Sequence, residues 1–198
     1  MDRDDWNARY SGPELLWKAE PNRFLVEEIA DLQPGRALDV ACGEGRNAVW
    51  LADRGWQVTG VDFSDVALSK ARRLADDRGV SVEWVNADVA GWDPPADAFD
   101  LVILFYLQLP EAERHQVYGR MARGLAPGGT FLAVGHDREN LTAGYGGPQD
   151  PQFLFSAEDV VGDLPGLKIV KAEQVRRPVD TDDGVRTALD ALVRAVRP

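Results

Sequence analysis

A glycine-rich turn between two short apolar runs is the feature that most constrains how this chain folds. The first run covers residues 37–41 and leads into Cys42-Gly-Glu-Gly45, after which apolar residues recur at helical spacing over residues 46–54. The second run, residues 57–61, is followed directly by Asp62. A strand, a glycine turn, a helix and a second strand ending on an acid predict a unit that binds a nucleotide-like cofactor.

Strand and helix patterns alternate on both sides of this unit. A helix starting at Pro21 precedes it and is closed by Pro34-Gly35. Apolar runs then predict strands over 80–85, 99–105 and 130–134, of which 99–105 fits a central strand covered on both faces. Intervening helices are expected from Ser64 or Asp65 to Gly79, and from near Glu111 to the turn Pro127-Gly128-Gly129. Such alternation predicts a parallel, right-handed, doubly wound sheet.

The last third of the chain changes character. Residues 136–152 are polar and glycine-rich, as in a functional loop, and Ser156 with Asp159 indicates the start of a short helix. Residues 167–175 and 187–196 predict two antiparallel strands across a turn at 180–184, although the second segment also fits a helix.

These patterns predict an α/β fold class. We expect a doubly wound, mostly parallel seven-stranded Rossmann-like sheet with an antiparallel C-terminal strand and an N-terminal helical cap. The sequence shows no internal repeat or linker, so we expect one domain over residues 1–198, with the cap at 1–35 and the core at 36–198.

Composition limits the partners of the chain. A formal net charge of −11 and a pI near 4.6 disfavour nucleic acid, because phosphate binding relies on clustered lysine and arginine. No segment resembles a leader or a membrane span, so we expect a cytoplasmic protein with no membrane partner, as a monomer or homodimer. One cysteine and two histidines exclude an internal disulfide and offer little to a metal, and we predict no metal. A small-molecule substrate is the better expectation.

The glycine turn alone does not identify the cofactor, because NAD-dependent oxidoreductases and adenosyl-cofactor enzymes share it and Asp62 suits the ribose of either. Three features favour the adenosyl cofactor. Asp39 is a carboxylate inside an apolar strand, where an ammonium-bearing ligand is a suitable partner. Asp88 follows the third strand and suits an adenine amino group. The sharp turn before the fifth strand is one that dinucleotide folds do not specially require.

Together the motifs resemble those of class I S-adenosylmethionine-dependent methyltransferases. The matching segments, in the family's order and spacing, are Leu38-Asp-Val-Ala-Cys-Gly-Glu-Gly45, Gly60-Val-Asp-Phe-Ser64, Asn86-Ala-Asp88, Phe99-Asp-Leu-Val-Ile103 and Leu125-Ala-Pro-Gly-Gly129. The resemblance implies S-adenosyl-L-methionine as cofactor, with its methionine part on the glycine loop and its ribose on Asp62. Phe63 and Val89 would cover the adenine faces, and Asp88 its edge. The cofactor-binding residues that we predict are Tyr10, Trp17, Asp39, Ala41, Gly43, Gly45, Asp62, Phe63, Ala87, Asp88, Val89 and Phe105.

The N-terminal segment refines the resemblance. Trp6-Asn-Ala-Arg-Tyr10, followed by Trp17, is similar to the cap of small-molecule methyltransferases of the tellurite-resistance and thiopurine type. We expect it to fold over the cofactor, the alternative being a helix on the sheet with exposed indoles. Residues 105–110 lack the motifs of amino-methylating and cytosine-C5 enzymes, and Cys42 is interpreted as a small buried residue, not a nucleophile.

The resemblance implies methyl transfer by in-line displacement to a small-molecule acceptor such as a thiol or heterocycle. A sulfonium methyl group is already activated, so the protein has mainly to align the acceptor and exclude water. Tyr106 and His136 are the candidate catalytic residues, with a structural role for His136 as the alternative. Trp17, Tyr106, His136 and the loop 144–147 are expected to form the acceptor pocket. The rival functions are an NAD-dependent oxidoreductase and a non-catalytic adenosylmethionine-binding protein.

Overall fold

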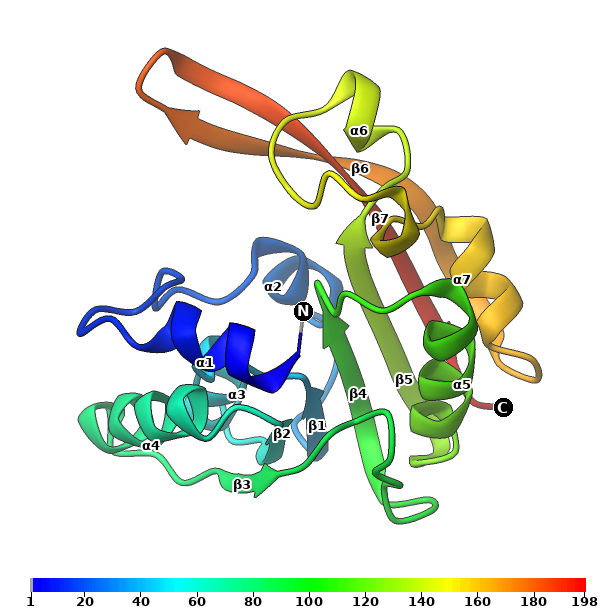
Figure 1. Cartoon of the computed structure of the whole chain (residues 1–198). Coiled ribbons are helices and arrows are strands. Elements are labelled where there is room, and N and C mark those ends of the chain that lie inside the picture. Colours follow the sequence, from blue (N-terminus) through cyan, green and yellow to red (C-terminus); the bar gives the residue numbers. More distant parts are fainter. Residues whose placement is uncertain (1) are drawn as a thin grey trace.

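Seven strands form one mixed sheet in the computed structural model, which describes residues 2–198 (Figure 1). In spatial order they are β3 (Glu83–Asn86), β2 (Gln57–Asp62), β1 (Arg36–Val40), β4 (Phe99–Phe105), β5 (Leu125–His136), β7 (Gly184–Val196) and β6 (Lys168–Thr181). β7 alone runs opposite to the other six strands, so its pairings with β5 and β6 are antiparallel and all other pairings in the sheet are parallel. The predicted fold class is therefore confirmed, with β4 at the centre of the sheet.

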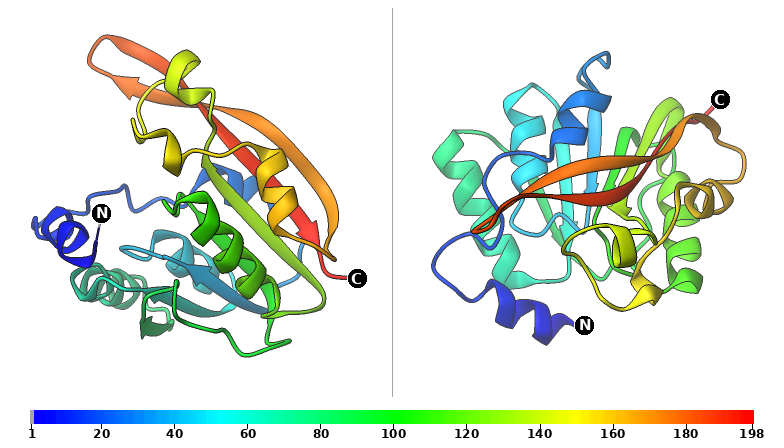
Figure 2. Two further views of the ribbon diagram at one scale, coloured as in Figure 1. Left: turned by 45° about the vertical axis from the view of Figure 1, so that its right-hand side comes forward. Right: turned by 90° about the horizontal axis from the view of Figure 1, so that it is seen from above.

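Helices cover both faces of the sheet. The two further views show the helices in separate layers (Figure 2). On one face lie α2 (Arg23–Glu28), α3 (Arg46–Asp53) and α4 (Asp65–Arg78), and on the other lie α5 (Glu111–Ala122) and α7 (Ala157–Asp163). The first helix, α1 (Arg3–Tyr10), packs against α4 instead of the sheet. Short turns of helix, α6 (Asn140–Ala143) and η1 (Pro151–Phe153), fill the segment after β5.

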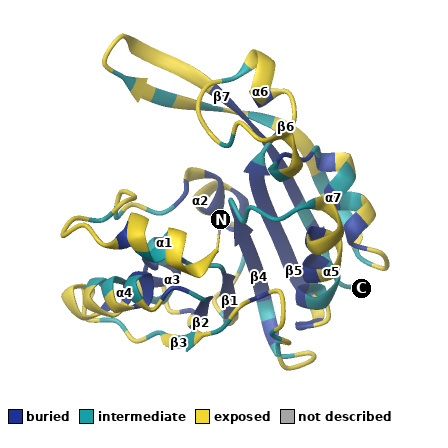
Figure 3. Cartoon of the chain, in the orientation of Figure 1, coloured by how far each residue is buried: buried dark blue, intermediate teal, exposed yellow. Residues whose placement is uncertain are grey.

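Each face of the sheet has its own hydrophobic core. Side chains of β4 alternate between the two cores, so that Val102 and Leu104 face α5 and α7 while Leu101 and Ile103 face α2 and α3. Residues 101–104 are fully buried for this reason, as the unbroken apolar run predicts. Figure 3 shows the buried residues concentrated in β1, β4 and β5 and the exposed ones in α1 and at the far end of the β6–β7 hairpin.

The predicted helix signals act as expected. Ser64 caps α4 by accepting a hydrogen bond from the Ala67 amide, and Gly79 ends it in the left-handed conformation. Ser156 and Asp159 form a reciprocal capping box at the start of α7. These caps fix where α4 and α7 begin, and therefore where the connecting segments before the two helices end.

Several elements differ from the sequence prediction. α2 covers only Arg23–Glu28 and does not continue to Pro34-Gly35, because the backbone leaves the helical conformation at Ile29. β5 begins at Leu125 instead of residue 130, because the glycines before it lie in an irregular part of the strand: the pairing moves from Phe99↔Leu125 to Leu101↔Thr130. β3 begins at Glu83, three residues late. The helical alternative for 187–196 is wrong, since β7 pairs along its length with both β5 and β6. No helix within residues 2–198 is long and apolar enough to cross a bilayer.

Candidate cofactor and acceptor site

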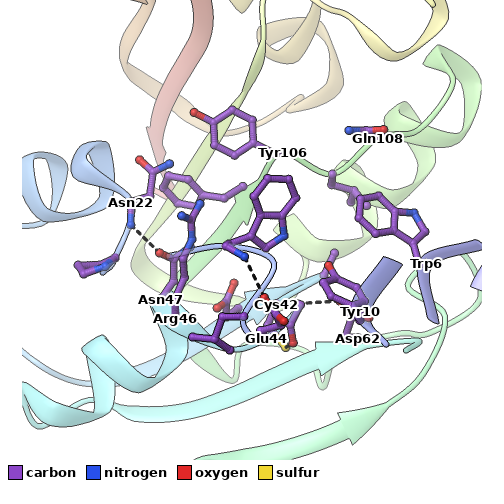
Figure 4. A pocket seen from close by; sticks show the side chains of 18 of the residues that line it. Trp6, Tyr10, Asn22, Cys42, Glu44, Arg46, Asn47, Asp62, Tyr106 and Gln108 are labelled. Atoms are coloured by element: carbon purple, nitrogen blue, oxygen red, sulfur yellow. Dashed lines mark hydrogen bonds between the residues drawn. The ribbon is translucent and has the colours of Figure 1, made fainter. Parts of the chain in front are cut away.

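A cavity of about 390 Å³ opens at the carboxyl ends of β1, β2 and β4, beneath the N-terminal segment (Figure 4). This edge is where ligands bind in doubly wound sheets. The predicted residues that line it are Tyr10, Trp17, Asp39, Ala41, Gly43, Asp62, Phe63, Asp88, Val89, Phe105, Tyr106 and His136. The fold thus brings side chains from the N-terminal cap and from the end of β5 around a single space.

Two predicted cofactor residues, Gly45 and Ala87, do not line the cavity. A Cβ atom on Gly45 would lie 2.6 Å from Trp84 and 2.8 Å from the Ala71 side chain, and its φ is +80°. Gly45 therefore serves the close packing of the glycine loop against α4 and β3. The backbone N–H of Ala87 donates a hydrogen bond to the Asp62 carbonyl at 3.1 Å, which links the segment after β3 to the end of β2.

Asp39 lies on the floor of the cavity without a full set of partners. It is 1% exposed, and its Oδ2 atom has no hydrogen-bond partner within residues 2–198. Burial raises the pKa of this carboxyl to about 7, while the backbone N–H of Ala48 acts in the opposite direction. A buried carboxylate with an unused oxygen fits an ammonium group of a ligand.

Asp62 is held rigidly at the end of β2. Its Oδ2 atom accepts a hydrogen bond from the Gly43 amide and its Oδ1 atom one from the Ser64 amide, both at 2.8 Å. Burial raises its pKa, and these backbone donors partly offset the rise. Each oxygen can accept a further hydrogen bond, so the side chain suits neighbouring hydroxyl groups of a ribose.

The glycine loop has the tight backbone that the sequence predicts. Ala41 and Gly43 both have a φ of +55°, in the left-handed region that a residue with a Cβ rarely adopts. A Cβ atom on Gly43 would lie 3.0 Å from the Tyr10 hydroxyl, so the cap and the loop approach each other closely here. Strain of this kind at Ala41 is typical of a binding site.

Glu44 fastens the cap to the loop. Its buried carboxylate accepts hydrogen bonds from the backbone amides of Leu16 and Trp17, at 3.0 and 3.1 Å. Lys70 of α4 donates to the same carboxylate at 3.0 Å. Trp17 is thereby placed at the cavity, as the predicted cap requires, although it is 42% exposed. No sequence pattern pointed to Glu44, because its partners are backbone amides of a distant irregular segment.

Tyr106 and His136 lie together on the opposite wall. Tyr106 directly follows β4 with a φ of +57°, and its amide donates to the Val134 carbonyl at 2.7 Å. Its ring centroid is 4.8 Å from that of His136. A left-handed aromatic residue is unusual, and here it turns the side chain toward the cavity.

Asp190 of β7 connects these two residues and was missed in the sequence. It is fully buried, accepts a hydrogen bond from the Tyr106 hydroxyl at 2.8 Å, and its Oδ1 lies 3.3 Å from Nδ1 of His136. Arg177 of β6 donates to it through Nε at 2.7 Å. Burial alone would raise the pKa of Asp190, but the contacts with His136 and Arg177 outweigh burial and hold it below the ordinary value.

Other lining residues were also missed. They come from the cap, from α3 and from the segment after β4, and include Lys18, Asn22, Arg46, Asn47 and Gln108. The Asn22 amide donates to the Asn47 side chain at 2.9 Å, which ties the end of the cap to α3. Figure 4 shows Asn22, Asn47 and Arg46 on one side of the cavity and Trp6, Tyr10 and Asp62 on the other.

The loop 144–147 does not line the cavity, which corrects the sequence prediction. Tyr145 is 45% exposed. Gly147 instead packs against His136, since a Cβ atom there would lie 2.9 Å from Nδ1 of the imidazole. The loop 144–147 therefore packs behind His136 and does not itself line the cavity.

Cys42 also borders the cavity. Its thiol makes only a weak contact, 3.9 Å from the Gly43 carbonyl oxygen, and burial raises its pKa well above the ordinary value. A thiol that stays protonated is a poor nucleophile, in keeping with the interpretation of Cys42 as a packing residue.

Comparison with known proteins matches residues 37–129 to a family model described as a methyltransferase domain. The chain is 34% identical over 125 residues to demethylmenaquinone methyltransferase of Thermus thermophilus, and the match covers 62% of this chain and 55% of that protein. The chain spans about half the length of the curated relatives it matches.

Two solved structures resemble the whole chain. One comes from work on the conversion of a disulfide bond into a thioacetal group during echinomycin biosynthesis; it has a TM-score of 0.78 and 26% identity, over 98% of this chain and 91% of that one. The other is N-methyltransferase NodS of Bradyrhizobium japonicum WM9 in complex with S-adenosyl-L-homocysteine, with a TM-score of 0.74 and 18% identity, over 99% and 98% of the two chains. The fold similarity thus extends beyond the matched domain to the cap and the C-terminal hairpin.

Proposed function

We propose that the chain is a class I S-adenosylmethionine-dependent methyltransferase that transfers a methyl group to a small-molecule acceptor, and the methyltransferase-domain match over residues 37–129 and the similarity to demethylmenaquinone methyltransferase support this. The observation that carries the proposal is the pairing of two carboxylates at one end of the cavity with an aromatic and imidazole wall at the other. The first end suits the cofactor and the second suits an acceptor.

The cavity residues fit the cofactor. The unused Oδ2 atom of Asp39 suits the ammonium group of the methionine part, and Asp62 suits the two ribose hydroxyls. Phe63 and Val89 flank the place we assign to adenine, and the side chain of Asp88, which is exposed at the cavity, suits the adenine amino group. Tyr10 and Trp17 of the cap would close over it.

When bound, S-adenosylmethionine supplies a methyl group already activated on a sulfonium. The protein then has to orient the acceptor and keep water away from it. The cap held by Glu44 covers the cavity, while Tyr106 and His136 are placed to contact the acceptor. The buried Asp190 carboxylate lies 3.3 Å from Nδ1 of His136 without an aligned hydrogen bond within residues 2–198, and its negative charge favours the tautomer with its proton on Nδ1. Nε2 could then take a proton from an acceptor hydroxyl, amine or thiol.

The size and lining of the cavity support a small acceptor. The Thermus relative is named for demethylmenaquinone, a small molecule, and about 390 Å³ is within the range of small-molecule sites. We further propose that the chain works in the cytoplasm. We also propose that it acts without nucleic acid, because its net charge of −11 opposes phosphate binding.

Calorimetry with S-adenosylhomocysteine, followed by an acceptor panel, tests the proposal. The purified chain should bind S-adenosylhomocysteine, and Asp62→Ala should weaken that binding at least tenfold. Asp53→Ala, an exposed acid on α3 away from the cavity, is the matched control and should leave it unchanged. A panel of thiols, thiopurines, phenols and amines, read as release of S-adenosylhomocysteine, then tests transfer.

The panel and a cofactor titration separate the rival functions. Tight binding of S-adenosylhomocysteine with no transfer to any acceptor would favour a non-catalytic binding protein. Absence of that binding, with a saturable change in the fluorescence of a reduced nicotinamide cofactor on titration, would favour an oxidoreductase. The matched methyltransferase domain over 37–129 disfavours the oxidoreductase, and the acceptor panel decides between transfer and binding alone.

A further inference from the structure

Charge is segregated within the cavity. The acidic residues Asp39, Asp62 and Asp88 lie at the ends of β1, β2 and β3. The wall formed by α3, the start of the segment after β4, and β6 instead carries Arg46 and Arg177. Lys18 and Arg23 also line the cavity on the side of the cap, but Arg23 is paired with Glu27 at 3.0 Å. Arg46 and Arg177 stand out in a chain whose formal charge is −11, because most of its surface repels anions.

Arg46 is the first residue of α3, directly after the glycine loop, and its side chain borders the cavity. Its guanidinium forms no hydrogen bond or ion pair with another residue of the described chain, 2–198. Burial lowers the pKa of Arg46 first, and the nearby charge of Arg177 lowers it further, while Tyr106 and Asp39 act the other way. Two cations that repel each other across a cavity are stabilised by an anion between them.

Arg177 projects from β6 over the ring of Tyr106, with its Cζ atom 5.4 Å from the ring centroid. Its Nε atom donates to Asp190 at 2.7 Å, and its Nη2 atom approaches the same carboxylate at 3.5 Å. A guanidinium has five N–H donors, and the contacts of Arg177 with Asp190 and with the Tyr106 hydroxyl use only part of them. Asp190 therefore orients the guanidinium of Arg177 so that the edge with Nε and Nη2 faces β7. Arg177 also lines the cavity, where a ligand can accept the hydrogen bonds of the opposite edge.

We propose that the acceptor is a planar carboxylic acid, whose carboxylate is held by Arg46 and Arg177 beside Tyr106 and His136. The aromatic rings of Tyr106 and Phe105 at the cavity suit a planar body, and two guanidinium groups suit a carboxylate. The inference rests on the proposed methyl transfer and names the substrate class of the same cavity. In this arrangement Asp39 still binds the ammonium group of the cofactor.

Calorimetry on the chain loaded with S-adenosylhomocysteine tests the inference directly. The probes are salicylate, 2-mercaptobenzoate and quinoline-2-carboxylate, each compared with its primary amide. We expect at least one acid to bind at least tenfold more tightly than its amide. Arg177→Met should remove that preference and leave the affinity for S-adenosylhomocysteine within threefold.

Arg176→Met is the matched control. Arg176 precedes Arg177 on β6, is exposed where Arg177 is partly buried, and carries the same charge. Its removal should leave both the preference for the acid and the affinity for S-adenosylhomocysteine unchanged. A loss of preference in both variants would mean that only the overall charge matters, which would overturn the proposal.

Arg46→Gln provides a second variant in case Arg177→Met fails to fold, since the guanidinium of Arg46 makes no hydrogen bond or ion pair within residues 2–198 and interacts with the nearby Asp39 carboxylate only through its charge. It should also lower the affinity for the acid. If it instead weakens S-adenosylhomocysteine binding tenfold and leaves the acid preference intact, Arg46 serves the cofactor and the proposed pair is wrong.

Equal binding of acids and amides, or no binding of any acid at roughly 1 to 10 mM, would overturn the inference while the proposed function stands. Failure to bind S-adenosylhomocysteine at all would instead remove the proposed function itself.

Discussion

The Tyr106 hydroxyl donates a hydrogen bond to Oδ2 of Asp190 at 2.8 Å, although 84 residues separate them in the chain. The contact joins the residue after β4 to a fully buried position on β7, two strands away across the sheet. Asp190 also meets Arg177 and His136, so one carboxylate orients three side chains that border the cavity. The wall of the cavity that we assign to the acceptor therefore depends on the C-terminal hairpin.

Asp190→Asn should impair turnover more than cofactor binding. The variant removes the charge that orients Tyr106 and Arg177, and we expect kcat/KM for the acceptor to fall at least tenfold. Asp190 itself does not line the cavity, so the Kd of S-adenosylhomocysteine should stay within threefold. Loss of a buried charge partner should also lower the free energy of unfolding by about 3 kcal/mol, measured by urea denaturation.

Asp163→Asn is the control for that loss of stability. Asp163 is buried and accepts from Arg114 at 2.6 Å between α5 and α7, away from the cavity. It should destabilise the fold by a comparable amount without changing kcat/KM. If both variants lower kcat/KM equally, Asp190 has no specific role at the acceptor wall.

Cofactor affinity should depend on pH through Asp39. The pKa of its carboxyl is about 7 in the folded protein, against an ordinary value of 3.8, because burial disfavours the charged form. The cofactor's ammonium requires the ionised form, so affinity should rise as pH rises through 7. We expect the Kd of S-adenosylhomocysteine to be about tenfold weaker at pH 6 than at pH 8.

Asp39 has the opposite effect on the folding stability of the protein without cofactor, which falls as pH rises. Between about pH 4 and pH 7 the unfolded chain releases the Asp39 proton and the folded chain retains it, so this group makes the fold less stable as pH rises through that window. Asp39→Asn should flatten the pH dependence of binding and weaken binding at pH 8. A Kd that varies equally with pH in this variant would assign the dependence to another group.

Glu44→Gln should loosen the cap. The carboxylate accepts from the Leu16 and Trp17 amides with one oxygen each, and a glutamine offers only one acceptor oxygen. The ion pair with Lys70 is lost as well. We expect hydrogen exchange of the Leu16 and Trp17 amides to accelerate at least tenfold, and S-adenosylhomocysteine to bind more weakly. Glu14→Gln, an exposed acid on the same segment, should change neither measurement.

Gly147→Ala should act on the acceptor site through His136. The new methyl group would lie 2.9 Å from Nδ1 of the imidazole and displace it, so kcat/KM should fall while binding of S-adenosylhomocysteine is retained. Gly146→Ala is a close control, because its φ of +72° is similar to the +77° of Gly147 but no heavy atom lies within 4 Å of its added Cβ. Both should cost about 1 kcal/mol of stability from backbone strain. Equal activity in the two variants would show that the position of His136 does not matter.

The cofactor end of the site could be predicted from local sequence. Asp39, Gly43 and Asp62 lie within one strand, turn, helix and strand unit, whose geometry follows from short-range patterns of apolar residues and glycine. The pairing of β1 with β2 then brings Asp39 and Asp62 to the same edge of the sheet without help from distant segments. Asp88 follows for the same reason, since β3 pairs with β2.

The acceptor end could not be predicted in this way. His136 and Tyr106 were found because each ends a recognisable strand, but Arg177 and Asp190 lie within β6 and β7, where nothing in the local pattern separates them from other charged strand residues. The loop 144–147 was assigned to the cavity from its composition alone, and the fold places it behind His136. Glu44 was missed because a side chain that binds distant backbone amides leaves no periodic signal.

Local patterns in the chain were enough to establish the succession of strands and helices, the glycine loop and the carboxylates that suit the cofactor, because these depend on contacts between neighbouring segments. The positions of the residues that complete the cavity depend on contacts between segments far apart in the chain. The antiparallel insertion of β7 between β5 and β6 sets Asp190 opposite His136 and near Arg177, and this register depends on packing of the hairpin against β5. Charges far apart in the chain meet there because the sheet, not the local sequence, fixes their distance.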